Sequence, residues 1–437
     1  MKVAKFGGSS VSGAEQFKKV KDIVLSDPQR RIVIASAAGK RSSGDHKLTD
    51  LLYLCHAHLT YGVSCDEIMD TIERRFADIR DALGLSMDVE GEFKTLRAML
   101  NKDISADFLV SRGEYFTSRL LAEYLGFDFL DAAECIFFGF DGQIDKERSY
   151  KAIAQAAQKG GGLVIPGFYG KLPTGKIKVM SRGGSDISGA LAAAAVEAEV
   201  YENWTDVSGI LMADPRIVKD PSPIEKLTYA ELRELAFMGA SVLHEESVQP
   251  VREKGIALNI KNTNLPSHPG TMILESVEED KRQQERFITG IAGRRNFTVF
   301  TITKRNMNGS ATLRQALEIL DRYHAPVEHI TLGLDSFALV CATAALGEGL
   351  YDVLGDMQKT CRPDDVQVQD SIALVAAVGR KMTFRPGISG KIFKALGECG
   401  INIRTIAQGA DELSIIVGVD NGDFETAIRV LYEGFAG

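Results

Sequence analysis

The sequence predicts an α/β protein in which a mostly parallel sheet covered by helices is followed by smaller α+β units. Up to about Leu211, short apolar runs typical of strands alternate with amphipathic helical segments, and this alternation indicates βα units. Beyond a charged stretch at Glu275–Arg286 the pattern changes to strand–helix–strand–strand repeats. With 437 residues, the chain is long enough for two or three domains.

The N-terminal part begins with a short alternating strand around Val3 and Phe6, followed by glycines and a helix. Ser12 and Glu15 have the S-x-x-E spacing of a capping box, which predicts the start of that helix. Residues 66–110 are helical in pattern and charged, and we expect a helical insertion that shapes the mouth of a site. The clearest further elements are strands at Arg31–Ala38, Phe127–Asp131, Gly162–Pro166, Glu199–Trp204 and Ala257–Lys261, and a helix at Leu227–Met238.

The C-terminal part has two repeats after the stretch at Glu275–Arg286, which is the best linker candidate because its polarity leaves little to bury. Both repeats have the order strand, helix, strand. The first comprises strands at Phe297–Thr303, Val327–Thr331 and Phe337–Ala342 and a helix at Ala311–Tyr323. The second comprises strands at Ala373–Val378 and Leu413–Val419, a helix at Gly390–Gly400 with Ile401–Ile403 after it, and a final helix from Asp423. Periodicity alone predicts a tandem of small α+β units.

Composition excludes several classes of protein. The net charge of −8 argues against a nucleic-acid partner, which requires a basic face. No apolar stretch approaches the roughly 18 residues of a spanning helix, and no signal-peptide core follows Met1. We therefore expect a cytoplasmic protein without a membrane partner. Six cysteines without a C-x-x-C pair fit a reducing compartment. Cys55 and His58 share a helical face, but two ligands do not close a zinc shell, so we expect no dedicated metal site.

Two glycine-containing loops point to phosphate chemistry. In the first, Lys5 ends a strand, and Gly7, Gly8 and two hydroxyl residues precede a helix. Backbone N–H groups at such a corner bind phosphate well. A single Gly-Gly pair would more readily be a structural turn, but Ser181–Asp186 is a second, richer glycine loop before a helix-forming run. The Walker motif, the protein-kinase elements and the dinucleotide fingerprint are all absent from the sequence, which excludes the common phosphoryl-transfer templates and a fused dehydrogenase.

Five segments of the sequence stand out as motifs. They are KFGGSSV at the start, Lys47–Asp50, Ser111–Glu114, SRGGSD at Ser181–Asp186, and WTDVSG with ADPR in Trp204–Arg216. In these segments, in their order and at fitting distances, the chain resembles the aspartokinases of the amino-acid kinase superfamily, and the resemblance extends over essentially the whole chain. The resemblance implies an amino-acid kinase (carbamate kinase-like) αβα sandwich at 1–280, followed by two ferredoxin-like ACT units at 286–365 and 366–437.

The implied activity is ATP-dependent phosphorylation of the side-chain carboxylate of L-aspartate, giving 4-phospho-L-aspartate and ADP. This is the first step towards lysine, threonine and methionine, with feedback through the ACT units. The resemblance implies catalytic roles for Lys5 and Asp186. It implies aspartate contacts from Thr49, Glu114, Arg182 and Ser185. It implies nucleotide contacts from Lys5, Gly7, Gly8, Ser9, Thr205, Asp206 and Arg216, with Mg²⁺ carried by ATP. It places an amino-acid effector at Met307, Asn402 and Ile403. The family's usual assembly predicts a homodimer or larger oligomer through the ACT units, for which Phe297–Thr303 would be a suitable edge strand.

The chemistry of this reaction agrees with these residue types. A carboxylate is already an anion at neutral pH and needs no general base, so positive charge and alignment should dominate catalysis. Taken singly, each residue has a plain alternative: Arg182 and Asp186 could be a surface ion pair, Glu114 a solvated helix residue, and Asp206 part of a turn. Their joint occurrence favours the site.

Some positions depart from the family pattern and leave alternatives open. Leu211 stands where many members carry tyrosine, and Ser241 where lysine-sensitive members often carry lysine. Gly333 and Leu334 replace the polar effector contacts typical of lysine-inhibited members, so the inhibitor could be lysine, threonine or both. The rival functions are a kinase for glutamate, N-acetylglutamate or carbamate, and a catalytically silent amino-acid sensor. The long C-terminal tail and the SRGE segment argue against the first rival, and the joint presence of Lys5, Arg182 and Asp186 argues against the second.

Overall fold

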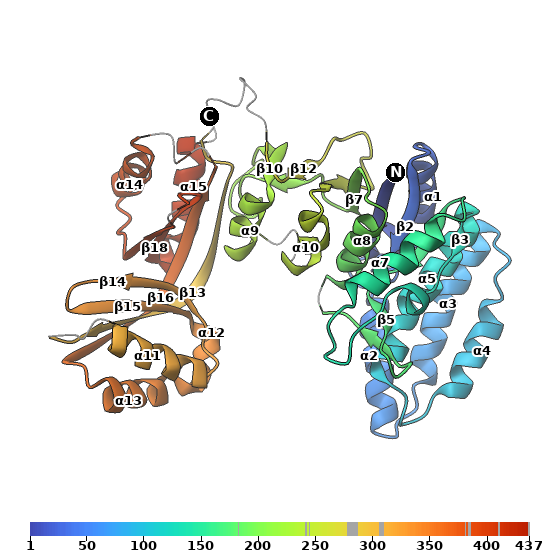
Figure 1. Ribbon diagram of the computed structural model, residues 1–437, viewed down its shortest axis with the longest axis horizontal. Coiled ribbons are helices and arrows are strands. Elements are labelled where there is room, and N and C mark those ends of the chain that lie inside the picture. The colour runs from blue at the N-terminus through green and yellow to red at the C-terminus, as the bar shows by residue number, and fades with distance from the viewer. Residues whose placement is uncertain are drawn as a thin grey trace. The chain divides into compact units, whose positions relative to one another are not determined.

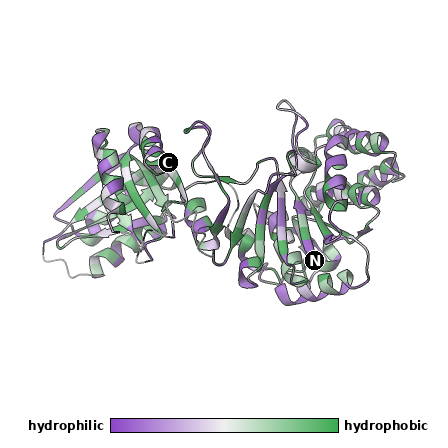
Figure 2. Ribbon diagram, turned by 90° about the horizontal axis from the view of Figure 1, so that it is seen from above, coloured by the Kyte–Doolittle hydropathy of each residue, from purple (hydrophilic) through white to green (hydrophobic). Residues whose placement is uncertain are grey.

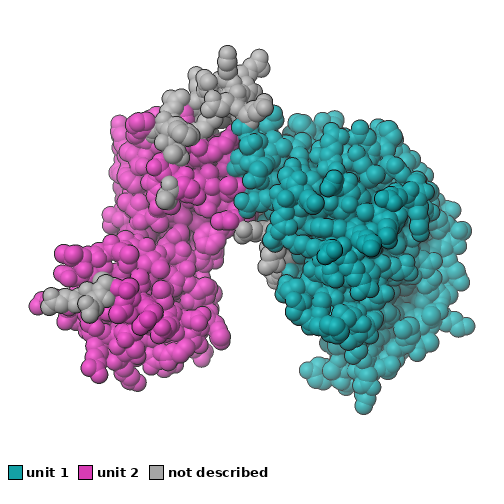
Figure 3. Space-filling model, viewed as in Figure 1, with its two compact units in different colours: residues 1–210, 225–229, 241–277 teal, residues 211–224, 230–240, 278–437 magenta. Residues whose placement is uncertain are grey.

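The chain folds into two compact units (Figure 3). The computed structural model describes residues 1–181, 183–240, 243, 245–277, 287–305, 310–380, 382, 386–409 and 411–435. The first unit contains Met1–Ile210, Glu225–Tyr229 and Ser241–Val277, and the second contains Leu211–Ile224, Ala230–Ala240 and Glu278–Gly437. Within the described residues, no helix is both long enough and apolar enough to cross a membrane.

The first unit is built on an eight-stranded sheet with the order β10-β12-β11-β7-β1-β2-β4-β3. Its strands are β1 (Lys2–Phe6), β2 (Arg30–Ala35), β3 (Asp128–Phe129), β4 (Leu163–Pro166), β7 (Val200–Thr205), β10 (Lys226–Thr228), β11 (Ala257–Asn262) and β12 (Thr271–Leu274). Every neighbouring pair is parallel except β11 with β12. The predicted mostly parallel sheet is therefore confirmed, and β1 lies between β7 and β2 near its middle.

Helices cover both faces of this sheet (Figure 1). One face shares a hydrophobic core with α1 (Ala14–Leu25), α2 (Leu48–Thr60), α3 (Asp66–Leu83), α4 (Val89–Met99) and α5 (Ala106–Leu125). On the other face, α8 (Gly184–Ala195) contacts β1, β2 and β7, and α7 (Lys146–Ala157) and α10 (Glu245–Glu253) pack against α8. Alternate strand residues point to opposite faces, so Phe6 enters the first core while Lys5 faces α8. Figure 2 shows how apolar residues follow the strands while hydrophilic residues line the outer sides of the helices.

The remaining elements up to residue 237 are short. The first unit contains the 3-10 helix η1 (Gly8–Val11), α6 (Ala132–Cys135), β5 (Tyr169–Lys171) and β6 (Ile177–Val179). The strand β8 (Ile210–Leu211) spans the unit boundary, and β9 (Pro223–Ile224) and all but the first residue of α9 (Tyr229–Phe237) belong to the second unit. The predicted helical insertion at 66–110 is confirmed as α3, α4 and the start of α5.

The predicted capping box is wrong. The chain makes the turn η1 directly after Gly7, so α1 starts at Ala14 with Gly13 as its N-cap and without a side-chain cap. The Ser12 hydroxyl instead donates to the carbonyl of Ser9 at 3.2 Å. The S-x-x-E spacing predicted the cap, but the Ser12 hydroxyl is already hydrogen-bonded within the turn that precedes α1.

The second unit contains an antiparallel six-stranded sheet with the order β14-β15-β13-β16-β18-β17. Its strands are β13 (Gly290–Thr303), β14 (Val327–Leu332), β15 (Ser336–Ala342), β16 (Asp365–Val378), β17 (Thr405–Gln408) and β18 (Ser414–Asp420). Its helices are α11 (Ser310–Arg322), α12 (Thr343–Leu346), α13 (Leu350–Cys361), α14 (Ile388–Glu398) and α15 (Phe424–Phe435). The 3-10 turns η3 (Gly347–Gly349) and η5 (Asn421–Asp423) complete it. Two separate cores, one under each half of the sheet, match the predicted pair of α+β units.

Two long strands run through both halves of this sheet. The first residues of β13, Gly290–Arg294, pair with Leu374–Val378 of β16, and the later residues Phe297–Thr303 pair with β15 and with the start of β16. Asn296, with φ of +68°, lies at the irregularity between the two parts. The predicted edge strand Phe297–Thr303 is thus central, and that prediction is wrong; β14 and β17 form the edges.

The exact domain limits stay a prediction. The strand order shows why contiguous halves are hard to define, since β13 contributes to the sheet of each α+β unit. Most of the predicted linker, residues 278–286, lies outside the described residues.

Candidate active site

The first glycine corner closes where β1 meets β7 and the loop after β2. The N–H of Gly7 donates to the carbonyl of Trp204 at 2.9 Å, and the N–H of Gly39 donates to the carbonyl of Gly8 at 2.8 Å. A Cβ on Gly39 would lie 2.6 Å from the backbone of Gly8, so this approach of two backbones requires glycine. Ser9 follows within η1 and is half-buried. The predicted strand–glycine corner is therefore present, followed first by a 3-10 turn.

Lys5 lies at this corner in a ring of three polar side chains. Its side chain is buried, and its Nζ lies 2.7 Å from Oδ1 of Asp186. The same carboxylate oxygen accepts a hydrogen bond from Nδ2 of Asn203 at 2.8 Å. Lys5 Nζ also donates to Oδ1 of Asn203 at 3.4 Å. The structure thus brings the two predicted catalytic residues into direct contact.

Asn203 was missed by sequence reasoning. The available signal was its place in the strand before Trp204, because side chains alternate along a strand and Asn203 and Lys5 are opposite one another in adjacent parallel strands. That pairing depends on the order of strands in the sheet, which the sequence pattern did not specify.

The second glycine loop forms the start of α8. Gly183 is its N-cap, with a φ of +80° that favours glycine, and a Cβ on Gly184 would lie 2.6 Å from the ring of Phe168. Ser185 and Asp186 occupy the first turn, where the helix dipole favours negative charge. Arg182, predicted to bind the α-carboxylate of aspartate, lies outside the described residues.

Glu114 is buried on α5 and only 4% exposed, which contradicts the alternative of a solvated helix residue. Its Oε2 has no hydrogen-bond partner in the described part of the chain. Burial raises the pKa of this carboxyl to about 8, although the backbone N–H of Ala37 opposes the shift. The carbonyl of Ala37 lies 3.0 Å from where a Cβ of Gly8 would be. Ala37 therefore contacts both the Glu114 carboxyl and the glycine corner. A buried acid with one oxygen unpartnered in the described part of the chain suits a cationic ligand.

Thr49 stands half-buried in the first turn of α2, after a loop that Arg75 holds from α3. The Arg75 guanidinium donates to the carbonyl of Gly39 at 2.5 Å and to that of His46 at 2.8 Å. It also lies 3.5 Å from Asp45. Partial burial works against ionisation of Asp45, but the N–H groups of Arg41 and the charge of Arg75 hold its pKa at about 2.

The predicted nucleotide residues are not all in one unit. Thr205 ends β7, directly after Trp204, and its hydroxyl donates to Asp206 at 3.1 Å. Asp206 is exposed. Arg216 belongs to the second unit, where it is exposed and forms an ion pair with Asp214 at 2.6 Å. The structure therefore groups Lys5, Gly7, Gly8, Ser9, Asp186 and Thr205 around one corner.

The predicted effector residues are only partly visible. Asn402 is exposed and Ile403 half-buried in the segment between α14 and β17. Met307 lies outside the described residues. Among the residues that can be described, no three His, Cys, Asp or Glu side chains gather as a metal ligand set. His58 is bonded to the carbonyl of Ser64, and Cys55 is buried.

Comparison with known proteins agrees with this architecture. A model of the amino acid kinase family matches residues 1–262, and an ACT domain model matches residues 375–435. Aspartokinase 3 of Bacillus subtilis is 32% identical over 452 residues, which cover 100% of this chain and 98% of that protein.

Solved structures give the same result over the full length. The crystal structure of Clostridium acetobutylicum aspartate kinase is 44% identical with a TM-score of 0.91, covering 99% of each chain. E. coli aspartokinase III in complex with aspartate and ADP is 28% identical with a TM-score of 0.78, covering 100% of each chain. The same E. coli enzyme in complex with lysine and aspartate is 27% identical with a TM-score of 0.77 and the same coverage.

The family match spans more than half of the chain, and the identity to aspartokinase 3 extends from end to end. The glycine corner with Lys5 and Asp186 lies within the kinase-family match, and the antiparallel C-terminal sheet lies within the full-length match to aspartokinase 3. The chain therefore belongs to the aspartokinases of the amino acid kinase family and is an aspartate kinase.

Proposed function

We propose that this enzyme transfers the γ-phosphoryl group of ATP to the side-chain carboxylate of L-aspartate, giving 4-phospho-L-aspartate and ADP. The observation that carries the proposal is the buried Lys5 ammonium, held by Asp186 beside a corner of backbone amides. A cation and oriented N–H groups are what a transferring phosphoryl group requires. The aspartate and ADP bound by the E. coli relative support the same pair of ligands here.

Aspartate binding is assigned to Glu114, Arg182, Thr49 and Ser185. Glu114 pairs with the substrate ammonium, because its buried Oε2 has no partner among the described residues. Arg182 forms a planar, bidentate contact with the α-carboxylate. Thr49 and Ser185, each in the first turn of a helix, supply hydroxyls. This arrangement leaves the side-chain carboxylate free to react.

Transfer follows from charge and alignment. The side-chain carboxylate is the nucleophile and loses no proton, so the enzyme must mainly offset repulsion between two anions. Lys5 provides the positive charge, Asp186 holds it in place, and Gly7, Gly8 and Ser9 provide close N–H and hydroxyl contacts. Thr205, Asp206 and Arg216 bind the nucleotide. Mg²⁺ arrives with ATP and neutralises phosphate charge, coordinated mainly by phosphates and water.

The test is ADP release with aspartate, glutamate, N-acetylglutamate and carbamate as separate substrates, with the acyl phosphate trapped by hydroxylamine. We expect ADP and trapped product with aspartate only. Preference for another acceptor would favour the rival kinases, and release with none would favour the silent sensor.

The biological setting is proposed to be the cytoplasm, at the first step of lysine, threonine and methionine synthesis, with amino-acid feedback. The ACT match and the lysine bound by the E. coli relative support feedback. Met307, Asn402 and Ile403 are the proposed effector contacts, and lysine is the first candidate.

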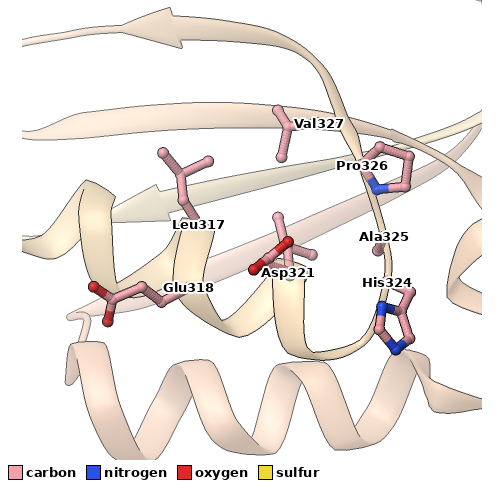
Figure 4. A pocket seen from close by; sticks show the side chains of 8 residues that line it. Leu317, Glu318, Asp321, His324, Ala325, Pro326 and Val327 are labelled. Carbon is pink, nitrogen blue, oxygen red and sulfur yellow. The ribbon is translucent and has the colours of Figure 1, made fainter. Parts of the chain in front are cut away.

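The second unit also carries the proposed pairing face between two copies of the chain. The edge strand β14 exposes Ile330 and Leu332, and Leu332 is 66% exposed. Beside it lies an open groove of about 630 Å³ between the end of α11 and the start of β14. Figure 4 shows Leu317 and Val327 at its apolar side and Glu318 and Asp321 at its acidic side. An unpaired strand edge with apolar residues favours pairing with a second strand, so we expect at least a homodimer.

Oligomeric state tests this pairing face. The natural chain should sediment as a dimer or larger. Leu332→Lys should shift it towards the monomer, because it places a charge on the strand edge that the proposed dimer would bury. Tyr351→Lys on α13, where the side chain is 82% exposed, is the control and should remain associated. A monomeric natural chain would remove the proposal.

A further inference from the structure

We propose that Asn203 is a positioning residue for phosphoryl transfer, because its amide joins the Lys5 ammonium and the Asp186 carboxylate in one hydrogen-bonded ring. This inference rests on the proposed role of Lys5. Asn203 donates to Asp186 Oδ1 at 2.8 Å and accepts from Lys5 Nζ at 3.4 Å, while Lys5 lies 2.7 Å from the same Oδ1. Each of the three side chains thus contacts the other two.

Strand register makes this ring possible. Lys5 in β1 and Asn203 in β7 are direct partners in parallel strands, so their side chains stand next to each other on the face covered by α8. Asp186 reaches them from the first turn of α8. Three segments far apart in sequence therefore supply one side chain each.

The strand β7 holds Asp186 at two points. Two residues before Asn203, and on the same face, the hydroxyl of Tyr201 donates to the backbone carbonyl of Asp186 at 3.1 Å. A Cβ on Gly189 would lie 2.3 Å from the Tyr201 oxygen, so α8 approaches this strand closely. Tyr201 binds the backbone and Asn203 binds the side chain, which together define where the carboxylate lies.

The amide has a chemical task that an apolar side chain could not perform. If the Asp186 carboxylate were paired only with Lys5, it could follow the ammonium as the ammonium moves. The carboxylate would then compete with the phosphoryl group for the positive charge of Lys5. The Asn203 N–H holds Oδ1 in place and takes part of its hydrogen-bonding capacity. An ammonium has three donors, and the ring uses two of them, which leaves one for a phosphoryl oxygen. Asn203 is only 4% exposed, so water has little access to replace its amide.

The first experiment replaces Asn203 by leucine or by aspartate, which are close to it in size. Leucine removes both hydrogen bonds, and aspartate replaces the donor to Asp186 by an acceptor. We expect kcat to fall about tenfold in each variant, because displacing an aligned charge is costly. KM for aspartate and for ATP should change less than about twofold. Asn259→Leu on the neighbouring strand β11, whose Oδ1 is buried without a partner in the described chain, is the matched control and should retain its kcat.

The decisive measurement is a double-mutant cycle with Lys5→Met, with active enzyme counted by ADP titration. If Asn203 acts through Lys5, the kcat of the double variant should be less than about twofold below the kcat of Lys5→Met alone. A kcat about tenfold below that of Lys5→Met in the double variant, or a normal kcat in Asn203→Leu, would overturn the inference. If Asn203→Leu does not fold, Asn203→Ser enters the same cycle under the same criteria. A normal kcat in Lys5→Met alone would instead overturn the proposed role of Lys5, so the two failures are distinguishable.

Discussion

Lys5 is the residue on which the proposed mechanism depends most. Its ammonium is buried, paired with Asp186 and adjacent to the glycine corner. Lys5→Met retains the aliphatic stem and removes the charge. We expect kcat to fall by about 10²–10³, by analogy with the loss of one preorganised donor at a reaction centre. Steady-state kinetics with ATP and aspartate measure it, and circular dichroism checks the fold. Near-normal turnover would remove Lys5 from the mechanism.

Glu114 should make aspartate binding depend on pH. Burial raises the pKa of its carboxyl to about 8 in the free enzyme, so at pH 7 it is mainly protonated. The substrate ammonium favours the ionised form and lowers that pKa, so binding should release up to one proton per site near pH 7. Calorimetry in buffers of different ionisation enthalpy measures this release, and Glu114→Gln should abolish it. Unchanged proton release in Glu114→Gln would argue against the ammonium contact.

The raised pKa of Glu114 also makes the stability of the fold depend on pH. The folded-state pKa of Glu114 lies above its ordinary value of 4.5, so the folded chain binds more protons than the unfolded chain between these values. The contribution of this group is therefore full below about pH 4.5 and is lost as pH rises towards 8. Without aspartate, Glu114→Gln should flatten the decline in melting temperature over this range.

At the scale of elements, α3 acts on the site through one side chain. Arg75 is buried and binds the carbonyls of Gly39 and His46, which flank the loop that leads to Thr49. Gly39 in turn donates to Gly8 in the glycine corner. The helical insertion therefore holds the loop between the phosphate corner and the proposed aspartate contact.

Arg75→Met should loosen this loop. The carbonyls of Gly39 and His46 would lose the hydrogen bonds of the guanidinium, and Asp45 would keep Arg41 as its arginine partner. Loss of these partly buried hydrogen bonds destabilises the fold. We expect a lower melting temperature and a KM for aspartate raised about tenfold, with a smaller change in kcat. Arg80→Met on the same helix is the control, because Arg80 pairs with the exposed side chains of Asp81 and Glu90. Equal effects of both substitutions on KM would exclude a specific role for Arg75.

At the scale of the whole molecule, α9 connects the two units through the chain. Ala230–Ala240 belongs to the second unit, whereas the segments before and after it belong to the first. Glu231 in α9 is fully buried and binds the Arg380 guanidinium through both carboxylate oxygens at 3.0 and 3.1 Å. It also accepts from the Thr289 hydroxyl at 2.5 Å. The helix α9, which is flanked in sequence by segments of the first unit, is thus hydrogen-bonded to residues at the ends of β13 and β16 in the second unit.

Glu231→Gln should weaken feedback more than catalysis. Coupling between sites is typically about 1–3 kcal/mol, and loss of the charge should reduce it. We expect a normal uninhibited kcat and a several-fold higher concentration of lysine or threonine for half-inhibition. Arg429→Gln, which breaks a solvent-exposed pair with Glu425, is the control. If neither amino acid inhibits the natural chain, the C-terminal sheet is not a feedback sensor for these products.

Much of the fold could be predicted because its signals are local. Alternation of apolar strands with amphipathic helices predicted the parallel sheet, and the glycines around Lys5 and before Asp186 predicted two corners. These features depend on neighbouring residues, so a single sequence contains them. Local signals failed where packing chose between possibilities, as at Ser12, whose hydroxyl bonds to Ser9 within the turn before α1.

The sequence by itself determined the α/β class, the two glycine corners and the family that they indicate. Only the tertiary structure decided that Asn203 joins Lys5 and Asp186, that Glu114 is buried, and that Phe297–Thr303 is central in its sheet. Each of these depends on strand order or on contacts between residues far apart in the chain. Lys5 and Asn203, for example, are separated by 198 positions. A periodic pattern specifies which face of a strand is buried, but the neighbour on that face is selected by the packing of the whole unit.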